Sequence, residues 1–381
     1  MKYFLNEPSI SRLEKKYVLN ALNDNWLSIN GENTKIFEKK FSKFIGIKNS
    51  LGVQSGTAAL HLALKAANIK PNDKVIIPNF SCVASISSTS QCGAIPIIVE
   101  VERETLGLDF QYVVQAVEKF KPKAIQLVHV YGVPARDTEK IKNFCNKKKI
   151  ILIEDASEAL GAKIKNKNIG TFGKITVFSI RSEKMIGVGE GGVICSNDKK
   201  IFDRIKLLAA RSAPFRTSKN QYWKKYFHLG EGYNYMMPHL LGSVARGQIE
   251  RFKNYMMIKK INVGKLYRKF TYKNFVFTQK DIKNHKSVYW LNSLYFKNLS
   301  SEQVKKLGNF LIKKNIEIRS GFWPLANLKN FNSKYVGGKK VSKEMFEKTL
   351  VVPSTIHLKE KDIKYILSTI EKFINKKILK I

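Results

Sequence analysis

A series of short apolar runs, separated by helical patterns, constrains the fold of this chain more than any other feature. A strand candidate at 51–54 is followed by further runs at 75–77, 97–99, 125–130, 150–153, 175–180 and 193–195. Helical patterns lie between them, around 57–68, 110–119, 137–148 and 201–208. This alternation predicts an α/β fold with a mostly parallel sheet and helices on both faces.

The two ends of the chain differ from this central region. Two amphipathic helices precede it, one beginning near Ser9 or Ser11, either of which would cap it, and one at 35–45. The last third has fewer strand–helix units and more Lys-rich amphipathic helix. We therefore expect an N-terminal arm and large domain over residues 1–254, and a smaller C-terminal α+β domain over residues 255–381.

The stretch 174–192, KITVFSIRSEKMIGVGEGG, combines a strand with a glycine-rich turn. Lys184 lies in the turn, next to the apolar Met185 and Ile186. A lysine held against apolar surface loses its charge more easily, and a neutral amine can form a Schiff base with an aldehyde. The alternative is an ordinary surface lysine, of which this chain has many.

Two further features occur at the ends of predicted strands. Ser55, Gly56 and Thr57 begin a strong helix, whose N-terminus would suit a phosphate or carry only an ordinary cap. Asp155 directly follows a strand, at the end where ligands sit in parallel sheets. A lysine, a carboxylate and a helix N-terminus are together what pyridoxal phosphate requires, so they predict this cofactor.

The composition argues against several other classes of protein. Lys and Arg total 68 against 30 Asp and Glu, giving a net charge of +38, but these residues are spread along the chain and predict no nucleic-acid partner. The four cysteines, Cys82, Cys92, Cys145 and Cys195, form no CxxC pair, and predict neither a disulfide framework nor a metal site. No apolar window of membrane-spanning length is present, so we expect no membrane association and a cytoplasmic location.

Long motifs along nearly the whole chain resemble the DegT/DnrJ/EryC1/StrS family of nucleotide-sugar aminotransferases. They are NEPSI, NWLSINGENTKIFEKKFSKFIG, QSGTAALHLAL, VYGVPA, EDASEALGA, FSIRSEKMIGVGEGG, GYNYMMPHLLGSVARGQIERF and VVPSTIHL, in the family's order. The resemblance implies the type I fold of pyridoxal phosphate enzymes, like that of aspartate aminotransferase. It also implies a homodimer with shared active sites.

The resemblance assigns roles to the residues already singled out. Lys184 would form the Schiff base and carry the proton between cofactor and sugar. Asp155 would pair with the pyridine nitrogen, and Gly56, Thr57 and Ser179 would bind the cofactor phosphate.

Other cofactor contacts rest on the resemblance alone. Asn234 would reach the phosphate from the partner subunit. Glu158 would lie near the phenolic oxygen of the cofactor, unless it is a plain helix-face carboxylate. Cys82 stands where many members have an aromatic residue that stacks on the cofactor ring, so it would contact the ring in place of that residue; the nearest aromatic residue, Phe80, lies two positions away.

Four residues are candidates for substrate contacts. Arg319 matches a family position near the mouth of the site. Arg181, where the lysine loop departs from the family pattern, would contact an anionic part of the substrate or pair with Glu183. His228 and His129 are further candidates, although a single histidine is more often structural.

The resemblance implies transfer of an amino group from L-glutamate to a nucleotide-linked keto sugar for surface polysaccharide or glycan synthesis. A 4-keto-6-deoxyhexose, as in the synthesis of perosamine or viosamine, fits best. Alternatives are a free keto-cyclitol as acceptor, or a sugar dehydratase, in which histidine would replace Lys184. A basic regulatory or nucleic-acid-binding protein is the non-enzymatic alternative.

Overall fold

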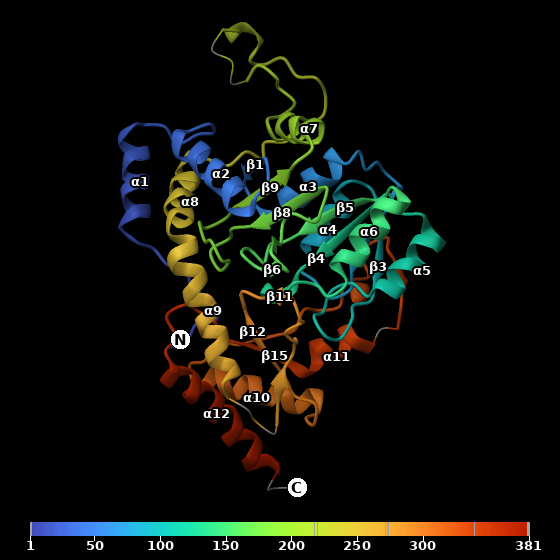
Figure 1. Cartoon of the computed structure of the whole chain (residues 1–381), viewed down its shortest axis with the longest axis vertical. Helices are drawn as coiled ribbons and strands as arrows, with labels where there is room; N and C mark the ends of the chain where they lie inside the picture. The colour runs from blue at the N-terminus through green and yellow to red at the C-terminus, as the bar shows by residue number, and fades with distance from the viewer. Residues whose placement is uncertain are drawn as a thin grey trace.

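A large central sheet organises the molecule (Figure 1). The computed structural model describes residues 2–216, 218, 220–270, 272, 274–338 and 340–378. In spatial order, the strands of the sheet are β1 (Asn49–Val53), β9 (Gly192–Ser196), β8 (Ile175–Ser179), β5 (Ile151–Asp155), β4 (Ala124–Val128), β2 (Lys74–Pro78), β3 (Ile95–Val99) and β14 (Lys334–Val336). β9 is antiparallel to both of its neighbours, and the other pairings are parallel.

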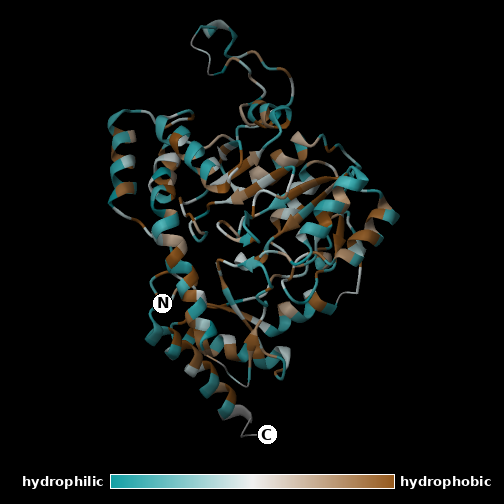
Figure 2. Cartoon of the chain, in the orientation of Figure 1, coloured by the Kyte–Doolittle hydropathy of each residue, from teal (hydrophilic) through white to brown (hydrophobic). Residues whose placement is uncertain are grey.

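Helices cover both faces of this sheet. On one face lie α3 (Gly56–Ala66), α4 (Ala84–Gln91) and α7 (Lys199–Ala209), whose apolar side chains pack against those of the strands. On the other face lie α2 (Glu32–Ile45), α5 (Phe110–Phe120) and α6 (Thr138–Lys148). Figure 2 shows hydrophobic strands inside and hydrophilic residues on the outer sides of the helices. The predicted mostly parallel sheet with helices on both faces is confirmed.

The N-terminal helix α1 (Arg12–Asn23) packs against a long helix from later in the chain. Ser11 caps α1: its side chain accepts the N–H of Leu13, and Glu14 bonds back to the N–H of Ser11. The structure therefore selects Ser11 over Ser9. The long helix comprises α8 (His239–Arg251), a π-helical segment Phe252–Met256, and α9 (Met257–Arg268).

The C-terminal part forms a second, smaller sheet, in which β10 (Val276–Phe277), β12 (Asn292–Tyr295), β15 (Thr349–Val352) and β13 (Arg319–Ser320) are antiparallel. Its core includes residues of α9, α10 (Ser301–Lys313) and α12 (Glu360–Ile378). Other elements of the described residues are the small sheet β11 (His285–Lys286), β6 (Lys163–Ile164) and β7 (Lys167–Asn168), helix α11 (Lys340–Lys348), and the short 3-10 helices Val130–Gly132, Tyr222–Lys224 and Leu325–Asn327.

The boundary at residues 254 and 255 stays a prediction. It falls inside the π-helical segment that joins α8 to α9. β14, from the C-terminal part, pairs with β3 at the edge of the large sheet, so the chain returns to the first domain after that point. Among the described residues, no helix is both long and apolar enough to cross a membrane.

Candidate active site

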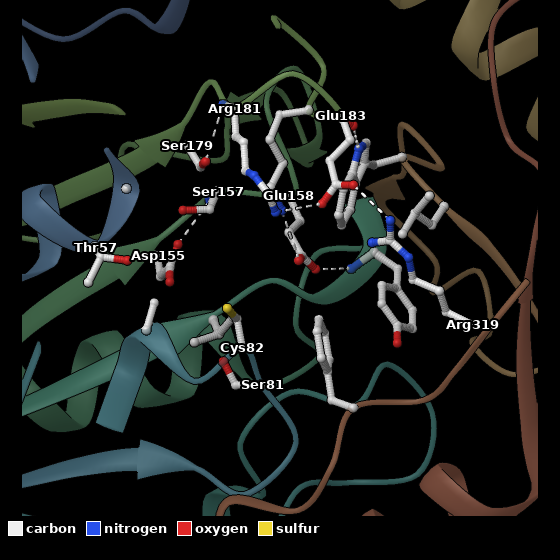
Figure 3. A pocket seen from close by; sticks show the side chains of 18 of the residues that line it. Thr57, Ser81, Cys82, Asp155, Ser157, Glu158, Ser179, Arg181, Glu183 and Arg319 are labelled. Carbon is white, nitrogen blue, oxygen red and sulfur yellow. Dashed lines mark hydrogen bonds and ion pairs between the residues drawn. The ribbon is translucent and has the colours of Figure 1, made fainter. Parts of the chain in front are cut away.

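A cavity of about 780 Å³ opens at the carboxyl ends of β4, β5 and β8, beside the N-terminus of α3 (Figure 3). Ligands bind at this end of parallel sheets. The cavity brings together most of the residues predicted from the sequence: Gly56, Thr57, Cys82, Asp155, Glu158, Ser179, Arg181, Lys184 and Arg319. The C-terminal part supplies the opposite wall, including Trp290, Phe322 and Val351.

The N-terminus of α3 forms the part of the cavity suited to an anion. Ser55 caps the helix by accepting the N–H of Ala58 at 3.1 Å. Helix geometry leaves the first N–H groups without intrahelical partners, and Gly56 and Thr57 carry them at the cavity wall. A Cβ on Gly56 would lie 3.0 Å from Cβ of Ser179, so glycine allows the end of β8 to approach. The N–H groups of Gly56 and Thr57 and the hydroxyls of Thr57 and Ser179 thus lie at one part of the cavity wall, where a phosphate would fit.

Asp155, the last residue of β5, is a buried carboxylate facing the cavity. One carboxylate oxygen accepts the N–H of Ser157 at 3.0 Å. Burial raises the pKa of Asp155, and the hydrogen bond from Ser157 and the charge of Lys184 offset this only in part. A buried carboxylate that accepts few hydrogen bonds from the protein suits a cationic N–H donor, such as a protonated pyridine nitrogen.

Lys184 extends into the same cavity and pairs with Glu158, with 3.1 Å between Nζ and Oε1. The other carboxylate oxygen of Glu158 accepts the backbone N–H of Tyr131 at 2.8 Å. Tyr131 has a left-handed backbone (φ 55°), which is uncommon for a non-glycine residue and occurs at functional sites. Burial raises the pKa of Glu158, and Lys184 and the N–H of Tyr131 act against this rise. Glu158 therefore lines the cavity beside Lys184 and is not a plain helix-face carboxylate, while its contact with the cofactor stays a prediction.

Trp290 is a residue of the cavity that the sequence reasoning did not identify. It lies between β11 and β12, is almost completely buried, and places its ring centroid 3.6 Å from Nζ of Lys184. Its indole N–H donates to the carbonyl oxygen of Glu183 at 2.6 Å. Its only signal in the sequence is its place in the apolar segment VYWL, which is equally typical of a core strand.

Charged side chains line the mouth of the cavity. Glu183 accepts hydrogen bonds from Arg319 at 3.0 Å and from Arg181 at 3.3 Å. Arg181 also pairs with Glu190 at 3.0 Å. The surface pairing considered for Arg181 is therefore present, while its side chain still lines the cavity. The two arginine side chains are about half-exposed, and ion pairs with such exposure contribute little to stability.

An aromatic group forms the wall below the lysine. Tyr131 and Phe322 stack with ring centroids 5.3 Å apart, and Phe80 packs edge-on against both from behind. Phe80 is fully buried and does not line the cavity, whereas Cys82 does. Phe80 therefore does not supply the aromatic ring that is missing at Cys82.

Comparison with known proteins places this site in a family. Residues 8–371 match the DegT/DnrJ/EryC1/StrS aminotransferase family. The chain belongs to this family. It is 32% identical over 378 residues to GDP-perosamine synthase of Escherichia coli O157:H7, covering 99% of this chain and all of the relative. It is also 34% identical over 325 residues to GDP-perosamine synthase of Vibrio cholerae, covering 84% of this chain and 85% of that protein.

The fold is likewise that of the family's sugar aminotransferases. The "PMP-form" of a putative sugar aminotransferase from Streptococcus pneumoniae superimposes with a TM-score of 0.89, covering 98% of this chain and 99% of that one, at 20% identity. The predicted family, type I fold, aminotransferase class and pyridoxal phosphate cofactor are thereby confirmed. The residue roles stay predictions.

The structure places His129 away from the aminotransferase cavity, so the predicted substrate contact lacks a geometric basis. Its side chain is fully buried, and Nδ1 accepts the N–H of Ala135 at 3.0 Å. The other ring nitrogen, Nε2, lies 3.2 Å from Oε1 of Glu154, within hydrogen-bond distance. Both ring nitrogens are used inside the protein, which is the structural role considered as the alternative.

His228 and Asn234 also lie outside the cavity of their own chain. His228 is exposed in the loop after α7, with Nδ1 2.7 Å from the carbonyl oxygen of Arg211. Asn234 is exposed where this loop returns, and its backbone forms a bridge with Ala210. Neither residue lines the cavity of its own chain, and the contact of Asn234 with the site of a partner subunit stays a prediction.

Proposed function

We propose that this aminotransferase moves the amino group of L-glutamate to a nucleotide-linked keto sugar, most specifically a 4-keto-6-deoxyhexose, for surface polysaccharide or glycan synthesis. The names of the two GDP-perosamine synthase relatives support this substrate class. The observation that carries the proposal is the convergence of Lys184, Asp155 and the N-terminus of α3 on one cavity.

The residues fit pyridoxal phosphate, which supplies an aldehyde and an electron-withdrawing ring. Gly56, Thr57 and Ser179 would hold its phosphate, and Asp155 would keep its ring nitrogen protonated. Lys184 would hold the aldehyde end and, once released, would remove and return the proton at the reacting carbon. Glu158 would keep the Lys184 amine at this position through the contact seen at 3.1 Å.

The mouth of the cavity is suited to substrates with negative charge. Arg319 and Arg181 are held there by Glu183, a partner that a carboxylate of glutamate or a phosphate of the nucleotide would replace. We assign to these arginines the binding of substrate anions. The acceptor would then lie with its keto carbon inside, near Lys184, and its nucleotide at the mouth.

A homodimer with shared sites is part of this proposal. The loop after α7 projects from the body of the molecule (Figure 1), and its large apolar side chains are largely exposed, among them Tyr226 at 90% and Tyr222 at 72%. Such a patch on a single chain favours a protein partner, and a second copy would bring Asn234 to the neighbouring site. Sedimentation at micromolar concentration should find a dimer. We expect the enzyme to act in the cytoplasm.

The first test is the visible absorption spectrum of the protein with pyridoxal phosphate, before and after L-glutamate. In the wild type we expect an absorption band of the Schiff base between Lys184 and the cofactor, and this band should change when glutamate is added. The Lys184→Ala variant should lack this band. Mass spectrometry of the product with a nucleotide-linked keto sugar should then show the amine. A dehydrated sugar, or activity only with a free keto-cyclitol, would instead establish one of the alternative reactions.

A further inference from the structure

Trp290 lines the cavity and lies directly against the amine of Lys184. The centre of its ring is 3.6 Å from Nζ of Lys184, on the apolar side of an amine that has Glu158 on its polar side. The Lys184 and Glu158 side chains are mostly buried, with 12% and 7% exposed. A cation over an aromatic face is attracted more strongly when water is excluded, so this contact is more than packing.

One turn supports both groups that hold the amine. The carbonyl oxygen of Gly132 accepts the N–H of Val288 at 3.0 Å, and that of Tyr131 accepts the N–H of Leu291 at 3.3 Å, on either side of Trp290. A Cβ on Gly132 would lie 2.5 Å from the backbone nitrogen of Trp290, so only glycine permits this approach. The same turn, Val130–Gly132, donates the N–H of Tyr131 to Glu158.

The lysine loop is fixed by the same indole. The ring N–H of Trp290 donates to the carbonyl oxygen of Glu183, the residue before Lys184. Asn6 donates to the same carbonyl from the N-terminal arm. Both the backbone before Lys184 and its amine are thus in contact with Trp290.

We propose that Trp290 is a positioning residue, which with Glu158 holds the free amine of Lys184 directed into the cavity. This inference rests on the proposed function, because it concerns the lysine that captures the cofactor. In that step the Lys184 nitrogen bonds to the aldehyde carbon, two hydrogens of the amine pass to the carbonyl oxygen, and that oxygen leaves as water. An amine already held in place reacts faster than one that must find its position.

The test measures covalent capture of pyridoxal phosphate by the apoprotein, rather than turnover. The rate is followed by absorbance, and the bond is fixed with borohydride and located on Lys184 by peptide mass spectrometry. We expect Trp290→Leu to slow capture about 5- to 20-fold, and Trp290→Phe, which keeps a ring face but loses the N–H, by less than about threefold. Trp26→Leu, at a half-exposed tryptophan outside the cavity, is the control and should react like the wild type.

A double-mutant cycle separates positioning from support of the fold. In a Lys184→Ala background, Trp290→Leu should change the noncovalent dissociation constant of pyridoxal phosphate by less than about twofold, because the ring acts through the lysine. An equal loss of affinity in that background, or equal rates for the Leu and Phe variants, would overturn the proposal. If Trp290→Leu does not fold, Trp290→Met replaces it in the cycle. A wild type that forms no bond at Lys184 would refute the proposed function itself.

Discussion

Two neighbouring carboxylates at the end of β5 serve two different regions of the molecule. Asp155 faces the cavity, and Glu154 faces a closed region that contains His129 and the turn 170–173. Successive side chains of a strand point to opposite faces, so adjacent residues can take unrelated roles.

Hydrogen bonding differs between the two regions. Glu154 accepts the N–H groups of Gly170, Phe172 and Gly173 at 2.7–2.8 Å, and a further bond from His129. Asp155 accepts one backbone N–H, from Ser157.

The pKa shifts reflect this difference. Burial would raise the pKa of Glu154, but the hydrogen bonds from His129, Gly170 and Gly173 outweigh it, and the pKa is lowered. The pKa of Asp155 is raised, because burial dominates. A buried charge that the protein satisfies completely stabilises the fold, whereas one that it leaves partly unsatisfied beside a cavity is available to a ligand.

The largest effect should come from Asp155→Asn. The amide keeps the shape of the side chain but removes the charge that would hold the ring nitrogen protonated. We expect the glutamate half-reaction, followed by stopped-flow absorbance, to slow by about 1,000-fold, or about 4 kcal/mol. The free energy of unfolding of the apoprotein should change little. Near-normal half-reaction rates would show that the cavity does not use this carboxylate.

Glu154→Gln should mainly lower the stability of the fold, whereas Asp155→Asn should mainly slow the half-reaction. Its amide nitrogen would face an N–H donor, so we expect a loss of about 3 kcal/mol in the free energy of unfolding at pH 7, measured with denaturant. Because the pKa of Glu154 is lowered by folding, its contribution is complete above about pH 5 and disappears as pH falls through the folded pKa. The difference from the wild type should therefore shrink in acid. A difference that stays the same at every acidic pH at which both proteins remain folded would contradict this account.

The smallest effect should come from His129→Leu, which separates the structural role from the predicted substrate contact. Loss of the acceptor for Ala135 and of a donor to Glu154 should lower the free energy of unfolding by about 1–2 kcal/mol. The KM values for both substrates should stay within about twofold of the wild type, with His129→Gln as the milder variant. A KM increase of tenfold or more for one substrate would restore the substrate role.

The sequence determined those features that are local in the chain. The strands and helices of the large sheet follow from apolar patterns a few residues long. Asp155 and the turn at Ser55 were predictable because each stands at the end of a strand or the start of a helix, and such ends meet at one edge of a parallel sheet. For Lys184, position alone favoured a surface lysine; its joint occurrence with Asp155 and the turn at Ser55 predicted the cofactor, and the family motifs then assigned the lysine its role.

Only the tertiary structure decided which side chains face each other across long separations. Trp290 meets the carbonyl oxygen of Glu183 from 107 residues away, and Arg319 meets its carboxylate from 136 residues away. The residue type alone does not show whether His129 lies in a cavity or in the closed core. Its burial against Glu154 and Ala135 assigns it to the core. Local patterns fix which face of an element is apolar, but the partner of a polar or aromatic side chain depends on how distant elements pack.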